Sequence, residues 1–387
     1  MNTDHTHRVL SSLRSVSDAK RIRGAVLTAI GEPAPYTESR PIVVEDLELD
    51  APGDGEILVR VEAAGICHSD LSVVNGDRPR PVPMLLGHEA AGIVEQVGPD
   101  TGLSVGDRVV MTFLPRCGDC AGCRSNGRFP CAVGSAANNE GTLLGGHRRL
   151  HDASGAVNHH LGASAFATHA VVSERSVVKV GDDVPPDVAA LFGCALLTGG
   201  GAVMNVLKPT ADSAVAVVGL GGVGMAALIV AKALGVQRII GVDAPPAKLD
   251  AATALGATEV YTPAQAVEAG VTADGVVEAV GNPRALETAI ALTGMGGTTV
   301  TVGLPAPGQT IAVDPLALTA QARAIVGCYL GSAVPSVDIK IYEDMWRDGR
   351  LDVTPLISSR IRLDQINEAM DSLTDGATTL RQIIEFP

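Results

Sequence analysis

The spacing of apolar and polar positions changes its period about halfway along the chain of 387 residues. From Gly24 to about Ala195, short apolar runs alternate with turns rich in Gly and Pro, for example ILVRVEA at 57–63, GIVEQV at 92–97 and RVVM at 108–111. Runs of this length, bounded in this way, predict short strands. We therefore expect a mostly antiparallel, barrel-like β domain in this part of the chain.

Beyond Thr198, strand-length and helix-length segments alternate. The pattern predicts strands at 215–219, 238–243, 275–280, 298–303 and 324–329, with helices at 222–234 and 248–255. Strands that alternate with helices indicate a parallel, doubly wound sheet. The pattern of the last segment, 330–387, is mixed, and we expect it to pack back on the first domain.

These patterns predict an α/β protein of two domains, and the length is sufficient for two cores. We expect a β-barrel domain made of 24–195 and 330–387, which includes a compact lobe at 113–135, and a nucleotide-binding domain at 196–329. The polar segment 1–23 lacks the apolar run of a secretory signal, and we expect it to be a flexible N-terminal extension.

Composition narrows the class of protein. Apolar residues make up 46% of the chain, charged residues 19%, and the formal net charge is −14, which opposes binding to nucleic acid or to anionic membranes. Two uncharged stretches, 188–207 and 213–231, reach the length of a membrane span, but each contains four glycines and is interpreted as buried core. We expect a cytoplasmic protein without a membrane or nucleic-acid partner.

A glycine-rich turn follows the strand predicted at 215–219. The sequence Gly219-Leu-Gly221-Gly-Val-Gly224 has the G-x-G-x-x-G pattern, in which the glycines allow a tight turn, close approach of a pyrophosphate and close helix–strand packing. The pattern alone is weak evidence in a chain with 44 glycines. Asp243, which ends the next strand 19 residues after Gly224, completes the pattern of a dinucleotide site.

Asp243 also predicts which dinucleotide binds. A carboxylate accepts hydrogen bonds from the ribose hydroxyls of NAD but repels the 2′-phosphate of NADP, and Ala244-Pro245-Pro246 supplies no arginine to neutralise that phosphate. We therefore expect NAD, with Lys248 within reach of the same ribose.

The cysteines indicate a metal site. Four of the seven cysteines fall within fifteen residues, and without a secretion signal this spacing favours metal over disulfides. Four thiolates with no open position suit a closed tetrahedral zinc site, although an iron–sulfur cluster uses the same ligands. The predicted ligands of this structural metal are Cys117, Cys120, Cys123 and Cys131.

Three further residues are chemically suited to a metal but dispersed. Cys67 lies in GICHSD, His88 in GHE and Cys194 in FGCA. Each of these residues, taken alone, is better interpreted as structural. Their wide spacing in the sequence does not indicate that they share one metal site.

Taken together, these motifs resemble the zinc-dependent medium-chain dehydrogenase/reductase family, and within it the long-form, two-zinc alcohol dehydrogenases of the class III type, over about Gly24–Pro387. The resemblance implies a GroES-like barrel domain, a Rossmann domain, two Zn²⁺ per chain, NAD and a homodimer. It implies reversible oxidation of primary or secondary alcohols to aldehydes or ketones, with hydride transfer from a zinc alkoxide to the nicotinamide. The alternative is oxidation of an S-(hydroxymethyl)thiol, the adduct of formaldehyde with a thiol.

By the same resemblance, Cys67, His88 and Cys194 hold the catalytic zinc. Asp70 and Glu89 lie behind these ligands and orient them. Quinone or enoyl reductases of the same superfamily lack the zinc ligands, and a non-catalytic relic of the fold would not need these supporting carboxylates.

A proton path begins at Ser69 in this resemblance. Ser72 stands where the family has a histidine, so protons are expected to leave through water or His68.

The resemblance also implies contacts to the cofactor and to the substrate. For Cys328, burial in the core is the better interpretation, and Arg78 near the pocket mouth, like Arg148 and Arg149 in the loop, is better interpreted as solvated than as a contact to an anionic substrate. The implied cofactor contacts beyond Gly219, Gly221, Gly224 and Asp243 are His68, Thr198, Gly222, Val223, Lys248, Val302, Leu330 and Arg381. The implied substrate-pocket residues are Phe113, His160, Leu161 and Leu304.

Overall fold

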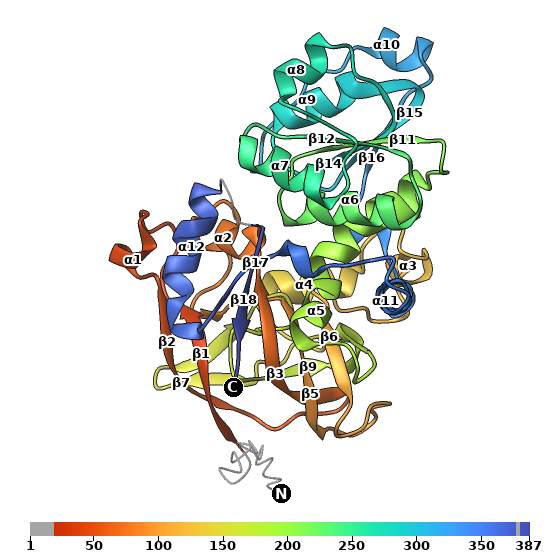
Figure 1. Cartoon of the computed structure of the whole chain (residues 1–387). Coiled ribbons are helices and arrows are strands. Elements are labelled where there is room, and N and C mark those ends of the chain that lie inside the picture. The colour runs from red at the N-terminus through yellow and green to blue at the C-terminus, as the bar shows by residue number, and fades with distance from the viewer. Residues whose placement is uncertain (1–18, 377–379) are drawn as a thin grey trace, which may run out of the picture.

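The computed structural model describes residues 19–376 and 380–387. Figure 1 shows two lobes, with a parallel sheet and its helices in one and the β-barrel in the other. Residues 1–18 of the expected N-terminal extension lie outside the described residues. The boundary at residue 23 was too late, because 20–23 already belong to strand β1 (Lys20–Leu27), which pairs antiparallel with β2 (Ile42–Leu49).

The barrel domain contains a small closed barrel and a larger sheet beside it. The pairing is mostly antiparallel, as expected from the short runs separated by turns. The barrel is formed by β1, β2, β7 (Leu150–Asp152), β8 (Gly155–His159) and β4 (Met84–Leu85). The larger sheet has the order β10 (Val177–Lys179), β6 (Arg108–Met111), β5 (Glu89–Val97), β3 (Glu56–Ile66), β18 (Arg381–Glu385) and β17 (Ile357–Ile361), with β9 (His169–Ser173) paired to β3.

The C-terminal segment returns to this domain. Strand β18 pairs antiparallel with the end of β3, with Gln382 opposite Ile66, while α12 (Ile366–Asp375) covers the sheet nearby. This pairing matters for the site, because it brings the last strand of the chain next to Cys67, the residue that follows β3.

The second domain is a six-stranded parallel sheet with α8 (Pro263–Glu268) and α9 (Pro283–Leu292) above it and α6 (Gly222–Ala233) below it in Figure 1. Its central strand AVAVV is buried throughout, which is typical of a parallel sheet covered on both faces. The strand order is β13 (Glu259–Tyr261), β12 (Arg238–Val242), β11 (Ala214–Val218), β14 (Ala273–Glu278), β15 (Thr293–Thr301) and β16 (Ala324–Gly327). The helices are α6 (Gly222–Ala233), α7 (Pro246–Leu255), α8 (Pro263–Glu268), α9 (Pro283–Leu292) and α10 (Pro315–Ala320). The predicted α/β class with a barrel domain and a doubly wound domain is confirmed.

A long helical segment joins the domains. It consists of α5 (Pro186–Leu191) and the π-helical turns η2 (Phe192–Gly200) and η3 (Ala202–Leu207). By length and composition Pro186–Leu207 could cross a membrane, but 72% of its apolar window is buried inside the fold. A Cβ on Gly199 would lie 2.0 Å from the carbonyl oxygen of Val223, so this glycine allows η2 to pack directly on α6. We interpret the segment as a core helix.

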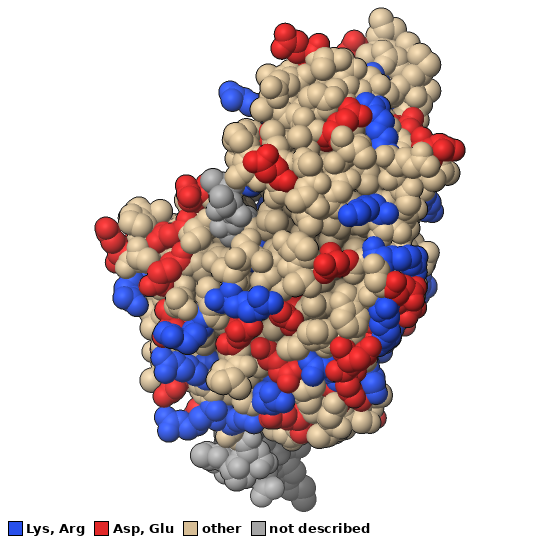
Figure 2. Space-filling view, viewed as in Figure 1, with Lys and Arg blue, Asp and Glu red and all other residues tan. Residues whose placement is uncertain are grey.

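Charged side chains of both signs are interspersed over the face shown in Figure 2. No continuous basic surface covers this face, in keeping with the net charge of −14.

Candidate active site

The run Cys67-His-Ser-Asp70 folds back on itself at the start of α2 (His68–Val74). Cys67 caps the helix, and Asp70 Oδ2 accepts the backbone N–H of Cys67 at 3.0 Å. The other oxygen of Asp70 lies 2.9 Å from His88 Nδ1, and both side chains are buried. One carboxylate therefore fixes both the helix start and the imidazole, leaving His88 Nε2 to face the opposite direction.

The three dispersed metal-ligand residues come together in this structure. His88 lies directly before β5, Cys67 directly after β3, and Cys194 in η2. Their ligand atoms and a Glu89 oxygen all lie within 4.8 Å of one another, with 3.5 Å between His88 Nε2 and Cys194 Sγ. Tetrahedral zinc with ordinary Zn–N and Zn–S bonds would separate these two atoms by about 3.6 Å. The residues present fit a zinc ion.

Glu89 and Arg381 form a buried ion pair behind this cluster. Arg381 Nε lies 3.4 Å from Glu89 Oε1, and Arg381 Nη2 lies 3.6 Å from Cys67 Sγ. Burial raises the pKa of Glu89 to about 7, while the guanidinium of Arg381 acts in the opposite direction. The same guanidinium occupies the space that a Cβ on Gly222 would need, at 2.2 Å from Nη1. Arg381 therefore lies between the cysteine–histidine cluster and the glycine loop.

The four clustered cysteines converge in a separate lobe, where α3 (Ala121–Arg124) and α4 (Ala132–Glu140) each begin with a cysteine cap. The Sγ–Sγ distances are 3.8 Å for Cys117–Cys123, 3.6 Å for Cys120–Cys123 and 3.7 Å for Cys120–Cys131. A tetrahedron with Zn–S bonds of about 2.3 Å requires sulfur separations of about 3.8 Å. Backbone N–H groups point at these sulfurs, for example that of Gly134 at Cys131, as suits thiolates.

The glycine loop is built as the sequence predicts. Gly219 has a positive φ of 95°, and a Cβ on Gly224 would lie 1.8 Å from the carbonyl oxygen of Gly219. By contrast, a Cβ on Gly221 would meet nothing within 4 Å, so the space in front of this residue is open. An open approach at the first turn of α6 is the cradle that a pyrophosphate requires.

Asp243 lies beside this loop at the end of β12. Its carboxylate accepts the N–H of Leu220 and the N–H of Ala244, each at 2.7 Å. Lys248 Nζ is 3.8 Å away. The side chain is thus held at the edge of the glycine turn, where a ribose would lie.

The other predicted cofactor contacts are spread around the junction of the two domains. His68 is exposed at the start of α2, and Thr198 and Val223 are half-buried on η2 and α6. Val302 is buried and uses its N–H within the fold, donating to Glu278 at 2.9 Å. Leu330 is buried with a φ of 50°.

Two further positions that the sequence singled out are buried and bonded within the protein. Burial raises the pKa of Cys328 to about 11, and its thiol contacts Ser332, as expected of a packing residue. Ser72 is also buried and donates to the carbonyl of His68 at 2.9 Å.

A cavity of about 80 Å³ adjoins His88 and Ser69. All four predicted substrate-pocket residues line it, together with Arg78. Sequence reasoning missed Val73, Arg80 and Tyr329; the alternation Arg78-Pro-Arg80-Pro was a signal for the arginine, whereas nothing near Tyr329 in the sequence marks it. Arg148 and Arg149 do not line this cavity. Arg148 donates to Asn158, and Arg149 donates to Glu56.

His160 is a polar residue in the lining of this cavity. Its Nδ1 lies 3.3 Å from Asp70 Oδ1, and its ring stands edge-on to that of His88 with 5.5 Å between centroids. Burial lowers the pKa of His160, and Asp70 acts in the opposite direction. Asp70 therefore contacts two imidazoles at once.

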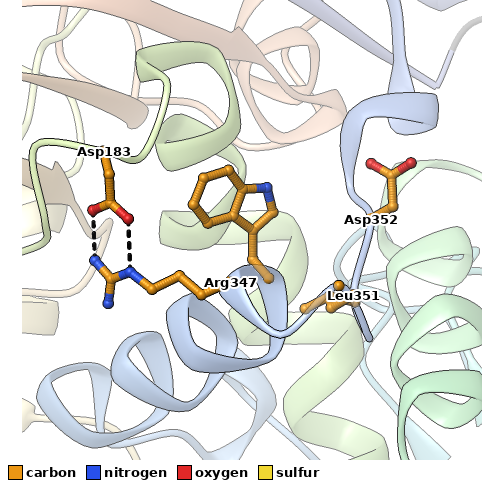
Figure 3. A pocket seen from close by; sticks show the side chains of 6 residues that line it. Asp183, Arg347, Leu351 and Asp352 are labelled. Atoms are coloured by element: carbon orange, nitrogen blue, oxygen red, sulfur yellow. Dashed lines mark hydrogen bonds and ion pairs between the residues drawn. The ribbon is translucent and has the colours of Figure 1, made fainter.

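A larger hollow, of about 450 Å³, lies elsewhere, beside Trp346 at the end of α11 (Pro335–Arg347). Figure 3 shows that its arginine, Arg347, is turned to Asp183 and bonded to it twice, at 2.7 and 2.8 Å. The arginine of this hollow is already neutralised within the protein, and none of the cysteine or histidine residues described above borders the hollow.

Comparison with known proteins agrees with this geometry. Residues 53–182 match the alcohol dehydrogenase GroES-like domain, and residues 222–347 match the zinc-binding dehydrogenase domain. Among curated relatives, the putative alcohol dehydrogenase D of Mycobacterium tuberculosis is 34% identical over 88% of this chain and 95% of its own length. The S-(hydroxymethyl)glutathione dehydrogenase of Synechocystis is 31% identical over 91% and 98%.

A solved structure is similar to this chain in fold as well as in sequence. The benzyl alcohol dehydrogenase of Acinetobacter calcoaceticus superposes with a TM-score of 0.86 at 33% identity, covering 95% of this chain and all of its own. Two domain matches and these relatives define a zinc-dependent oxidoreductase. The chain belongs to the zinc-binding alcohol dehydrogenase family, so the predicted family, fold, enzyme class and zinc cofactor are confirmed.

Proposed function

We propose that this protein is an NAD-linked alcohol dehydrogenase that reversibly converts primary or secondary alcohols to aldehydes or ketones. The observation that carries the proposal is the convergence of Cys67, His88 and Cys194 at a cavity bordered by Ser69. When bound, zinc supplies a Lewis acid for the alcohol oxygen, and the nicotinamide accepts the hydride.

The chain's own residues would hold the zinc ion, orient its ligands and deprotonate the alcohol. Cys67, Cys194 and His88 would hold the zinc ion, which would act as the Lewis acid. Asp70 fixes the ring of His88, and the Glu89–Arg381 pair lies against Cys67. Ser69 borders the cavity, and its hydroxyl would accept the proton of the alcohol while passing its own proton on to water or to His68.

The choice of NAD is supported by the position of Asp243. Its carboxylate lies at the glycine turn, and its nearest cation, Lys248, is 3.8 Å away. A 2′-phosphate at this place would meet a negative charge, whereas ribose hydroxyls would find an acceptor.

The Cys117, Cys120, Cys123 and Cys131 cluster is proposed as the structural zinc site. Its sulfur separations leave no open position for substrate, which suits a structural role. We further expect a homodimer in the cytoplasm, acting on a small molecule.

An S-(hydroxymethyl)thiol is the second candidate substrate. The relative from Synechocystis carries a name of this class. The arginines in the cavity favour it over a simple short alcohol, because a thiol such as glutathione bears carboxylates.

The test is NAD reduction with a panel of short, long and aromatic alcohols and a thiol adduct, measured together with zinc content. We expect wild-type protein to bind two zinc ions per chain and to reduce NAD. Cys67→Ser should lose the catalytic ion and at least about 100-fold in kcat/KM, because the ligand set is broken. The matched control Cys328→Ser, a buried cysteine outside both clusters, should keep both ions and the activity. Equal turnover by wild type and Cys67→Ser would overturn the assignment.

A further inference from the structure

His160 is a buried polar side chain of the cavity that the proposed chemistry does not use. Among the described residues that line the cavity, His88 and His160 are the two polar ones that are almost fully buried, each with 1% of its surface exposed. His88 turns Nδ1 to Asp70 and Nε2 to Cys194. By contrast, neither ring nitrogen of His160 has a hydrogen-bond partner within the part of the chain that the structure describes. A buried polar atom without a partner is unfavourable, so the ring calls for a group that is not part of the fold.

The backbone around His160 fixes the place of its ring. His160 directly follows β8, and its N–H donates to Ser164 Oγ at 2.9 Å. Its carbonyl accepts the N–H groups of Ala163 and Ser164, each at 3.1 Å, which closes a tight turn. The imidazole is therefore positioned by the fold before a substrate enters.

The neighbouring carboxylate decides which ring nitrogen of His160 carries the hydrogen. Nδ1 lies 3.3 Å from Asp70 Oδ1, the oxygen that also contacts His88. Burial acts to raise the pKa of Asp70, but the two imidazoles hold that pKa below its usual range, so the side chain is a carboxylate, which only accepts. Burial lowers the pKa of His160, so its ring is neutral and carries one hydrogen. A lone pair on Nδ1 would face the negative charge, so the hydrogen lies on Nδ1, and Nε2 is left as an acceptor.

The two imidazoles of the cavity are close enough to face the same small molecule. Their ring centroids are 5.5 Å apart. Two substrate oxygens, one reacting at the metal site of His88 and one facing His160, would therefore be only a few ångströms apart. This is the spacing of oxygens on neighbouring carbons, or on carbons separated by one other carbon.

We propose that His160 determines substrate specificity: its Nε2 accepts a hydrogen bond from a second hydroxyl group of the substrate, one or two carbons from the reacting carbon. The inference rests on the proposed dehydrogenase function and narrows its substrate class. The substrates are then 1,2- or 1,3-diols, and the products are hydroxyaldehydes or hydroxyketones. A site built to bond a substrate hydroxyl discriminates against an analogue that lacks it, because the buried acceptor is then left unpaired.

The test compares a second hydroxyl with groups of similar size that cannot donate. 1,2-Ethanediol is compared with 1-propanol and 2-methoxyethanol, and 1,3-propanediol with 1-butanol and 3-methoxy-1-propanol, with NAD as acceptor and kcat/KM counted per reacting hydroxyl. His160→Phe should lower the ratio of kcat/KM for the diol to that for the monoalcohol by at least about tenfold in one of the two series, about 1.4 kcal/mol. In wild type, the methoxy alcohol should react no better than the monoalcohol, because its ether oxygen has no hydrogen to donate.

Control measurements separate this role from effects on folding and on the metal. Because His160 contacts Asp70, zinc content and thermal denaturation are measured for each variant, and His160→Phe should keep two zinc ions per chain. Its reaction with the monoalcohols should change less than about threefold. His160→Gln, whose amide reaches the place of Nε2, should recover part of the diol preference. The matched control His147→Phe, at an exposed position, should keep the wild-type ratio.

A structure of the protein with a bound diol tests the contact directly. The second oxygen of the diol should lie within about 3.2 Å of His160 Nε2. If both oxygens lay at the metal site instead, the proposed contact would be wrong.

The kinetic outcomes distinguish this inference from the function on which it rests. Oxidation of the monoalcohols by wild type establishes the dehydrogenase independently of His160. A diol preference that persists in His160→Phe, an equal loss of diol and monoalcohol activity in that variant, or a methoxy alcohol that reacts as well as the diol would then overturn the role of His160 alone. No reduction of NAD with any alcohol would overturn both.

Discussion

At the scale of single residues, two carboxylates, those of Asp70 and Asp243, each accept hydrogen bonds from a turn of the backbone. Asp70 accepts the N–H of Cys67 and contacts His88 Nδ1, so the helix start and the imidazole are fixed together. Asp243 accepts the N–H of Leu220 inside the glycine turn, and we propose that it also binds the ribose of the cofactor. In both cases the local fold would have to change before the side chain could leave its position.

Replacing Asp243 tests its part in cofactor choice. Asp243→Asn keeps one oxygen, which can accept from the N–H of Leu220 or of Ala244 but not from both, and removes the negative charge that would repel a 2′-phosphate. We expect the ratio of kcat/KM for NADP to that for NAD to rise by at least about tenfold, about 1.4 kcal/mol. Steady-state kinetics with both cofactors measure it. Asp250→Asn, at an exposed position on α7, should leave the ratio unchanged. A wild-type preference for NADP would contradict this role of Asp243.

Single residues also show how far the sequence can predict the cavity. The family resemblance predicted four residues of the cavity lining, because a resemblance assigns positions throughout a fold. These residues are Phe113, His160, Leu161 and Leu304. Arg80 and Tyr329 did not follow, because their places depend on how a proline-rich loop and the chain after β16 meet the cavity. Such contacts come from tertiary packing and leave no period in the sequence.

At the scale of elements, the first turn of α6 contains one glycine that the fold requires and one that has open space in front of it. Gly224 has no room for a side chain, since its Cβ would lie 1.8 Å from the carbonyl of Gly219. Gly221 has ordinary extended backbone, with φ −80° and ψ −172°, and open space in front of it. The same motif therefore contains two different requirements.

Alanine at Gly224 should affect stability, whereas alanine at Gly221 should affect cofactor binding. Gly224→Ala should lower Tm by at least about 3 °C, because α6 must move away from β11. Gly221→Ala should leave Tm within about 1 °C of wild type but weaken NAD binding at least about tenfold, because the methyl group fills the approach to the pyrophosphate. Thermal denaturation without cofactor and calorimetric titration with NAD give the two readouts. If Gly221→Ala bound NAD as wild type does, the open space would not be the cofactor cradle.

The cysteine lobe is an element whose short helices both begin at metal-ligand positions. Cys123→Ser should reduce zinc from two ions to one per chain and lower Tm by about 5 °C or more, because the lobe has little apolar core to replace the metal. Metal analysis and thermal denaturation check this result. Cys328→Ser, which alters a buried thiol in contact with Ser332, should keep both ions. If Cys123→Ser retained two zinc ions per chain, the lobe would not be a metal site.

The elements themselves were largely predictable where the chain is periodic. The strand predicted at 238–243 ends one residue late, and the helix predicted at 222–234 is α6 with one extra residue. The π-helical turns η2 and η3 were not predicted, because their glycines at 199–201 resemble a turn in sequence and serve close helix packing in the structure. The pairing of β18 with β3 joins segments more than 300 residues apart, which no local pattern encodes.

At the scale of the whole molecule, the parallel sheet has an outer edge at β16, and large apolar side chains are exposed near it. Leu316 on α10 is 75% exposed and Met295 in β15 is 80% exposed. Gly296 donates to Gln321 at 2.8 Å, which ties the Met295 turn to the end of α10. Unpaired strand edges and exposed apolar residues favour association with another chain.

This edge is the place where we expect two copies of the chain to meet. Wild-type protein should have twice the mass of one chain in solution, and Met295→Glu combined with Leu316→Glu should shift it towards the monomer, because each copy would bring two negative charges into an apolar contact. Light scattering after size-exclusion chromatography measures the mass. Val105→Glu, which places the same charge at a 63% exposed position on the barrel domain, should leave the mass unchanged. A monomeric wild type would contradict the expected dimer. A double variant that stays dimeric would place the contact on another face, because each residue of a two-fold interface occurs twice in it.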